Sequence, residues 1–123
     1  MKKVVSIIPF KDLEAFVEKH KDKIIIVDFF TVWCGPCKWQ TESLAALEKT
    51  KELKNDIIIV KIDIDKDDER AEAFKIKSIP TLMFYKNGVV QTVKDEKKKN
   101  TDRLIGFREL NALLQVVNEL RGN

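Results

Sequence analysis

Two apolar runs, at 24–32 and 56–65, most constrain what this chain can fold into. The first reads IIIVDFFTV and shows no alternation of apolar and polar residues, and the second, DIIIVKIDID, is also mainly β-branched. A strand that is apolar on both sides is typical of a sheet covered by helices on both faces. Helical spacing follows each run, so the two strands are expected to lie parallel and to be joined by right-handed crossovers. The sequence therefore predicts an α/β fold.

The other segments complete the order β-α-β-α-β-α-β-β-α. Asn87-Gly88 supplies the positive φ angles of a tight turn and predicts a late antiparallel hairpin, so the sheet is expected to be mixed. The charged run at 94–102 is expected to be an exposed loop inserted into that hairpin. The remaining expected elements are a first strand at 4–8, helices at 10–20, from Pro36 to about residue 54, and at 67–76, the hairpin at 81–93, and a final helix within 103–123.

Composition and charge narrow the functional classes. At 123 residues with 44% hydrophobic and 35% charged residues, the chain fits one globular domain, residues 1–123. Its 23 basic and 20 acidic residues are spread along the chain, so nucleic acid is not an expected partner. The apolar segment before Pro9 is too short for a secretory leader, and no membrane association is expected. Two cysteines in such a chain favour a reducing compartment, the cytoplasm.

Both cysteines lie in the stretch WCGPCK, directly after the first apolar run. A zinc site needs three or four protein ligands, and this chain offers one cysteine pair and a single histidine, His20. His20 lies on the apolar face of the first expected helix, where packing is the simpler reading. No metal is therefore expected within one chain, and a zinc site shared between two chains stays an alternative.

A redox role explains the position of the pair better. Cys34 falls near the N-terminus of the helix that begins around Pro36, where unpaired N–H groups and the helix dipole stabilise a thiolate. Cys34 is then the attacking thiol. Cys37, two residues further on, can close a short disulfide and resolve a mixed disulfide formed at Cys34.

Two charged residues interrupt the apolar runs. Asp28 lies in the middle of IIIVDFF, where an unpartnered carboxylate loses hydration or its pKa rises. We interpret Asp28 as the proton acceptor that Cys37 needs before it attacks; the alternative is a structural acid bonded to nearby backbone. Lys61 interrupts the second run in the same manner and is a candidate neighbour of Asp28 on the adjacent strand.

The segments VDFFTVWCGPCK, VKIDID, SIPTLMFYKNG and RLIGF, in that order along almost the whole chain, resemble the thioredoxin family. The resemblance implies a central mixed sheet of four to five strands flanked by four helices, and dithiol–disulfide oxidoreductase activity without a bound cofactor. It assigns Cys34 as the attacking thiol, Cys37 as the resolving thiol and Asp28 as the buried acid beside Lys61. Gly-Pro between the cysteines is typical of reductants in this family, which favours a protein-disulfide reductase.

The resemblance also implies a substrate surface. It predicts a cis bond before Pro80, which would place Pro80 against the dithiol and the backbone of Ile79 where an extended substrate can pair with it. The other residues expected to line this surface are Trp33, Gly35, Pro36 and Gly106. Plainer readings remain: Trp33 as a core aromatic, Ile79 as a packed side chain, and Gly106 as a turn.

Disulfide-containing proteins are the expected substrates, a thioredoxin reductase or equivalent is the expected electron donor, and the expected state is a monomer. Two alternatives remain open: an oxidoreductase specialised for one pathway, and a thioredoxin-like binding module of a larger assembly. Two departures from the family bear on them. Trp39 stands where the family usually has a smaller apolar residue, and the insertion at 94–102 leaves the alignment of the last strand open.

Overall fold

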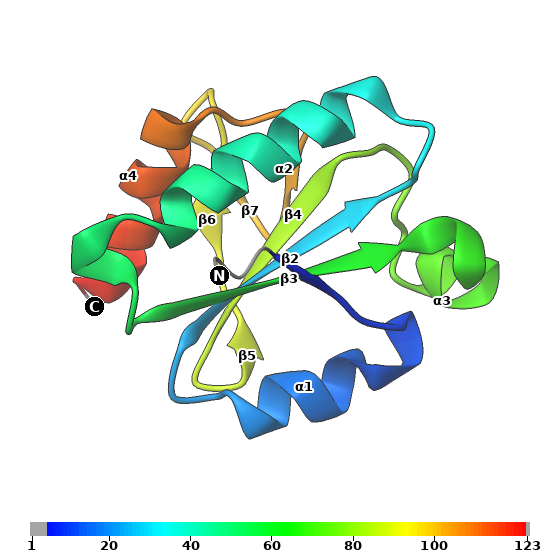
Figure 1. Cartoon of the computed structure of the whole chain (residues 1–123), viewed down its shortest axis with the longest axis horizontal. Helices are drawn as coiled ribbons and strands as arrows, with labels where there is room; N and C mark the ends of the chain where they lie inside the picture. The colour runs from blue at the N-terminus through cyan, green and yellow to red at the C-terminus, as the bar shows by residue number, and fades with distance from the viewer. Residues whose placement is uncertain (1–4, 123) are drawn as a thin grey trace.

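The computed structural model describes residues 5–122 and contains a six-stranded mixed sheet with helices on both faces (Figure 1). The strands of this sheet are β1 (Ser6–Ile7), β2 (Ile24–Phe30), β3 (Ile57–Asp63), β4 (Thr81–Lys86), β5 (Val89–Val90) and β8 (Leu104–Ile105). The helices are α1 (Leu13–Lys19), α2 (Gly35–Glu48), α3 (Asp68–Ala73) and α4 (Leu110–Arg121), and the 3-10 turns are Phe10–Asp12, Lys51–Leu53 and Ile64–Lys66. The predicted α/β fold with four helices is confirmed.

The centre of the sheet is the parallel pair β2 and β3, whose register runs from Ile24 opposite Ile57 to Phe30 opposite Asp63. Strand β1 lies parallel to β3 on one side, and β4 lies antiparallel to β2 on the other. All seven residues of β2 are buried, as expected for a central strand covered on both faces. The two apolar runs therefore form the central pair that the sequence predicts.

Alternation along the strands divides the core into two layers. Helices α2 and α4 cover one face and contact Ile24 and Ile26, whereas α1 and α3 cover the opposite face and contact Ile25 and Val27. Because side chains of a strand alternate between faces, Asp28 lies on the same face as Ile24 and Ile26, under α2 and α4. By the same spacing Lys61 lies on the face of Ile57 and Ile59.

The predicted hairpin turn is present at the other edge of the sheet. Asn87 and Gly88 have φ of 59° and 81°, so both take the left-handed conformation that a tight two-residue turn needs. Strand β5 follows and pairs with Tyr85 and Lys86 of β4, whereas β8 pairs with Thr81 and Leu82. Since β2 occupies the other side of β4, two short strands share one edge position, which makes six strands where four or five are predicted.

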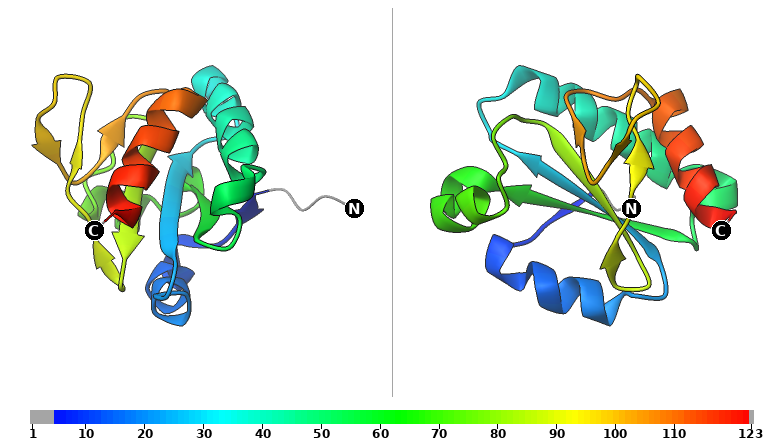
Figure 2. Two further views of the ribbon diagram at one scale, coloured as in Figure 1. Left: turned by 90° about the vertical axis from the view of Figure 1, so that its left-hand side faces the viewer. Right: turned by 180° about the vertical axis from the view of Figure 1, so that it is seen from behind.

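The charged insertion separates these two edge strands. Instead of the predicted loop it forms an antiparallel pair, β6 (Val93–Lys94) with β7 (Asn100–Thr101), which stands out at the edge of the molecule in Figure 2. The side chain of Asp95 closes its tip by accepting hydrogen bonds from the N–H groups of Lys97 and Lys99, both at 2.9 Å. These local bonds order the turn. We call β6, β7 and their connection, residues 93–101, the inserted hairpin.

Several elements are shorter than expected, among them the first strand and α2. The first strand is Ser6–Ile7 rather than 4–8, and residue 4 lies outside the described residues. Helix α2 ends at Glu48 rather than near residue 54, because Thr50 is extended (ψ 121°) and the chain continues as the 3-10 turn Lys51–Leu53.

The layer formed by α2 yields a stability prediction. Leu47 is fully buried against the sheet, so Leu47→Ala leaves a cavity and is expected to lower the free energy of unfolding by about 2–5 kcal/mol. Glu42→Ala, at an exposed position of the same helix, is expected to change it by less than about 0.5 kcal/mol. Urea unfolding measures both, and equal losses in the two variants would contradict this packing.

Candidate active site

The two cysteines lie where β2 leads into α2. Cys34 is the N-cap residue of α2, and its Sγ accepts a hydrogen bond of 3.1 Å from the N–H of Cys37. The two residues form a disulfide with their Cα atoms 5.3 Å apart. Gly35 and Pro36 are exposed and occupy the first helical turn, where the missing N–H of proline leaves no bond unmade. The sequence predicted this junction of strand, dithiol and helix correctly.

Asp28 is fully buried on the sheet face that α2 and α4 cover. Among residues 5–122, neither of its carboxylate oxygens has a hydrogen-bond partner. Burial raises the pKa of Asp28 from 3.8 to about 7, and the positive charge of Lys61 offsets only part of this effect. Backbone hydrogen bonds to the carboxylate, the structural alternative for this acid, are not present in the described part of the chain.

Lys61 is the neighbour of Asp28 that the sequence suggested, because the two residues are directly opposite in the β2–β3 register. Its ammonium group donates a hydrogen bond to Thr41 Oγ1 of α2 and lies 4.2 Å from the ring centroid of Phe30. Burial lowers the pKa of Lys61, and Asp28 opposes that shift. The lysine is thus held by the helix that carries the dithiol.

A third segment meets the dithiol at the start of β4. The Ile79–Pro80 bond is cis, as the resemblance implied, and Ile79 packs on the cluster formed by Phe30, Cys34 and Cys37. Gly106 has φ of 93° and donates its N–H to the carbonyl oxygen of Pro80 at 2.8 Å. The dithiol, the Ile79–Pro80 segment and Gly106 are therefore connected in space although they are distant in sequence.

Trp33 is not a core residue, since 70% of it is exposed. Its indole N–H donates to Asp65 Oδ2 at 2.7 Å, in the turn that follows β3. The Asp65 N–H in turn donates to Asp63 Oδ1 at 3.0 Å. The tryptophan next to Cys34 is thus fixed to the end of the neighbouring strand.

Sequence reasoning missed three polar residues around this site. Gln40 is fully buried and follows Cys37 at the helical spacing of the buried residues Leu44 and Leu47, which is a signal that could have been used. Thr41 and Arg108 carry no such signal. Their importance depends on Lys61 and on the turn at Gly106, which are distant in sequence.

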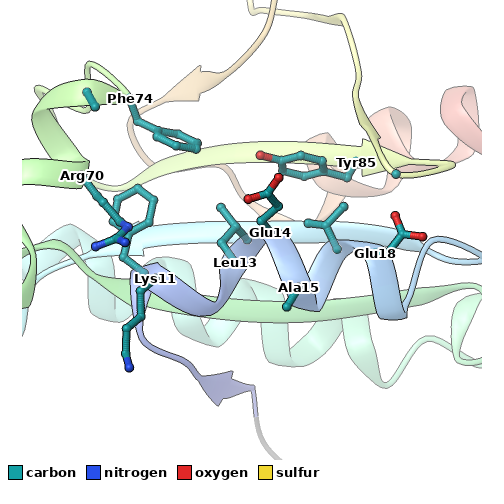
Figure 3. A pocket seen from close by; sticks show the side chains of 12 residues that line it. Lys11, Leu13, Glu14, Ala15, Glu18, Arg70, Phe74 and Tyr85 are labelled. Carbon is teal, nitrogen blue, oxygen red and sulfur yellow. The ribbon is translucent and has the colours of Figure 1, made fainter.

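A pocket of about 920 Å³ lies between α1 and β4, away from the dithiol. Figure 3 shows Leu13 and Glu14 on one side of it and Phe74 and Tyr85 on the other. It opens on the face of the sheet that α1 and α3 cover, whereas Asp28 lies on the opposite face. This pocket is therefore not part of the dithiol site.

Among residues 5–122, no group of three or more His, Cys, Asp or Glu side chains is arranged to hold a metal ion. His20 is half-buried, and its ring lies 4.6 Å from that of Phe16. Within the same described range, none of the helices has the length and apolar character to cross a membrane.

Comparison with known proteins identifies the family to which this chain belongs. The family model for Thioredoxin matches residues 4–115. A thioredoxin of Chlamydia trachomatis is 33% identical over 106 residues, which cover 86% of this chain and 91% of that protein. A thioredoxin of Rickettsia felis is 38% identical over 100 residues, covering 81% of this chain and 84% of that protein.

Solved structures agree with the sequence relatives. Chloroplastic thioredoxin z superposes with a TM-score of 0.80 at 26% identity and covers 100% of this chain and 99% of its own. The X-ray structure of Fasciola hepatica thioredoxin gives a TM-score of 0.69 at 29% identity, covering 93% of this chain and 98% of its own.

This fold with a CxxC pair at disulfide distance defines a thiol–disulfide oxidoreductase. The chain belongs to the thioredoxin family, and Cys34 and Cys37 are its redox pair.

The buried carboxyl predicts how stability depends on pH. Because the pKa of Asp28 is raised to about 7, the unfolded chain loses this proton before the folded protein does as pH rises from about 4. The protonated group favours folding at low pH, and about 4 kcal/mol of that advantage is lost by about pH 7. Asp28→Asn, whose amide does not titrate, is therefore expected to gain stability relative to the parent across this range.

Urea midpoints of the parent and of Asp28→Asn at about pH 4 and about pH 8 measure this difference. Asp22→Asn, at an exposed position, is the control and is expected to differ from the parent by a nearly constant amount. A constant difference for Asp28→Asn as well would contradict the raised pKa.

Proposed function

We propose that this protein works as a reductant of disulfides in other proteins, with Cys34 as the attacking thiol and Cys37 as the resolving thiol. The observation that carries the proposal is the hydrogen bond from the Cys37 N–H to Cys34 Sγ at the N-terminus of α2. A donor aimed at this sulfur, together with the positive end of the helix, stabilises a thiolate at Cys34 rather than at Cys37. Gly35 and Pro36 between the cysteines agree with a reductant.

The proposed reaction transfers two electrons from the dithiol to the substrate. The Cys34 thiolate attacks one sulfur of the substrate disulfide, forming a mixed disulfide and releasing the other substrate sulfur as a thiolate. Cys37 gives its proton to Asp28 and attacks Cys34 Sγ, which releases the second substrate thiolate. The Cys34–Cys37 disulfide of this structure is then the oxidised product.

Asp28 suits this proton transfer because its raised pKa, about 7, lies near neutral pH. Lys61, held by Thr41, lies opposite Asp28 and stabilises the carboxylate before it takes the proton. The carboxyl group is thus an acceptor of moderate strength, and it can return the proton to solvent once the substrate has left.

We propose that substrates bind over the surface around Cys34 formed by Trp33, Gly35, Pro36, Ile79, Pro80 and Gly106. Support comes from the packing of Ile79 on the two cysteines and from the bond between Gly106 and Pro80. An extended substrate segment would pair with the backbone at Ile79, beside the sulfur that attacks.

The proposed partners are disulfide-containing proteins and a thioredoxin reductase or an equivalent dithiol donor, which returns the oxidised pair to the reduced state. We propose that residues 1–123 act as a single domain and as a monomer in the cytoplasm, where such a donor keeps the pair reduced.

A second candidate function is that of an oxidoreductase specialised for one pathway. The inserted hairpin and the exposed contact between Trp39 and Phe107, with ring centroids 6.1 Å apart, favour it.

The roles of the two thiols predict asymmetric variants. Cys34→Ser is expected to lose the reduction of insulin by dithiothreitol completely, since no attacking thiolate remains. Cys37→Ser is expected to attack and then stall as a mixed disulfide, visible by mass spectrometry as a covalent adduct with the substrate. Adducts that accumulate with Cys34→Ser instead would reverse the assignment.

Asp28→Asn is expected to slow turnover near neutral pH at least about tenfold, because Cys37 loses its proton acceptor. The parent rate is expected to rise with pH through about 7, as Asp28 ionises, and the variant is expected to lack that step. Single-turnover measurements across pH test this, with Asp22→Asn as the control. An unchanged profile in Asp28→Asn would leave the acid with a structural role alone.

A further inference from the structure

Residues 105–108, from the last residue of β8 toward α4, lie against the segment that packs on the cysteines. We call residues 105–108 the 105–108 loop. Its Gly106 N–H bonds to the Pro80 carbonyl oxygen at 2.8 Å, directly after Ile79, which packs on Cys34 and Cys37. The loop also exposes two large apolar side chains, Ile105 at 56% and Phe107 at 41%. The loop therefore presents apolar surface next to the segment that packs on the two cysteines.

The loop is folded around the side chain of its own last residue. Arg108 Nη1 donates to the carbonyl oxygens of Ile105 at 2.9 Å and Gly106 at 3.2 Å, with that of Phe107 at 3.5 Å. Only 14% of this side chain is exposed. The two hydrogens of Nη1 thus bond the carbonyl groups of Ile105 and Gly106, with that of Phe107 at the outer limit of hydrogen-bond distance, so the loop is folded around the guanidinium.

Helix α2 holds the same residue by its backbone. The side-chain oxygen of Gln40 accepts from the Arg108 N–H at 2.8 Å, and its amide nitrogen donates to the Arg108 carbonyl oxygen at 3.0 Å. Gln40 is fully buried one turn after Cys37, so this pair of bonds is shielded from water. The loop is therefore fastened to the helix that carries the dithiol.

The inserted hairpin reaches the loop from outside. Glu96, near its tip, accepts a hydrogen bond of 2.7 Å from Arg108 Nη2, and its side chain is 69% exposed. Nη1 of Arg108 therefore bonds the 105–108 loop, and Nη2 bonds the inserted hairpin. A segment that contributes no residue to the dithiol is connected through Arg108 to the surface beside it.

We propose that Arg108, held by Gln40 and Glu96, is a positioning residue that sets the shape of the 105–108 loop for protein substrates, and that the inserted hairpin acts on substrate affinity through Glu96. This inference rests on the proposed reduction of protein disulfides. Chemistry at the sulfurs does not need the loop. A small disulfide reaches Cys34 without touching Ile105 or Phe107, whereas a protein substrate buries that surface.

The test compares a protein disulfide with a small one. Arg108→Met keeps the length and apolar stem of the side chain but removes its hydrogen bonds to the carbonyl groups and to Glu96. KM for insulin is expected to rise about tenfold with kcat little changed, because hydrogen bonds from a charged donor are lost. The reduction rate of dithiobis(nitrobenzoic acid) is expected to stay at the parent value. Arg70→Met, at a surface arginine of α3 paired with Asp67, is the matched control with no expected effect.

Glu96→Gln tests the role of the inserted hairpin and leaves the residues of the 105–108 loop unchanged. Since Glu96 is exposed, the variant is expected to fold like the parent and to raise KM for insulin about two- to fivefold, and less so at high salt. Glu119→Gln, exposed on α4, is the control. An unchanged KM in Glu96→Gln would overturn the role of the hairpin.

Other outcomes separate this inference from the proposed function. Unchanged insulin kinetics in Arg108→Met, or an equal loss with both disulfides, would overturn the positioning role while leaving the reductase intact. A parent protein that reduces neither disulfide would overturn the proposed function, and the inference with it.

Discussion

The parallel pairing of β2 with β3 is the constraint on which the rest of the structure depends. It extends over the whole of both strands, and its register brings Asp28 opposite Lys61. Because side chains alternate between faces, the same register directs both charged residues toward the helix that carries the dithiol. The ends of the strands are equally important: β2 leads into Cys34, and the turn after β3 supplies Asp65, which holds Trp33. The same strand pairing therefore forms the centre of the sheet and positions the residues of the active site.

Within this scaffold, burial dominates the electrostatics. A cation on the neighbouring strand would ordinarily keep a carboxyl ionised, yet the pKa of Asp28 lies near 7 because desolvation outweighs the attraction of Lys61. The Lys61 ammonium group bonds to Thr41 and leaves the carboxylate oxygens of Asp28 without a partner in the described range. An unpartnered acid opposes folding at neutral pH, and that cost supports the proposed role of Asp28 in proton transfer.

The edge of the sheet beside β4 is not formed by one simple hairpin. The insertion divides the edge into β5 and β8 and then returns to the 105–108 loop through Glu96 and Arg108. Charge runs of this kind are usually only solvated, and most of 94–102 is indeed exposed. A single contact from its tip nevertheless reaches the loop beside the cysteines. Under the proposed role of Arg108, variation in this edge hairpin would alter substrate recognition without changing the dithiol.

The sequence by itself determined the buried strands, the four helices, the Asn87-Gly88 turn, the dithiol at a helix N-terminus and the buried Asp28, because each depends on local periodicity or on one residue in an unsuitable environment. Resemblance to a family, rather than periodicity, supplied the cis bond before Pro80 and the place of Gly106. Only the tertiary structure decided the rest. It formed the hydrogen bonds from Lys61 to Thr41, between Gln40 and the backbone of Arg108, from Arg108 to Glu96, and from the indole of Trp33 to Asp65. These contacts join residues 12 to 68 positions apart, and no local pattern encodes how such residues meet once the sheet and its helices have packed.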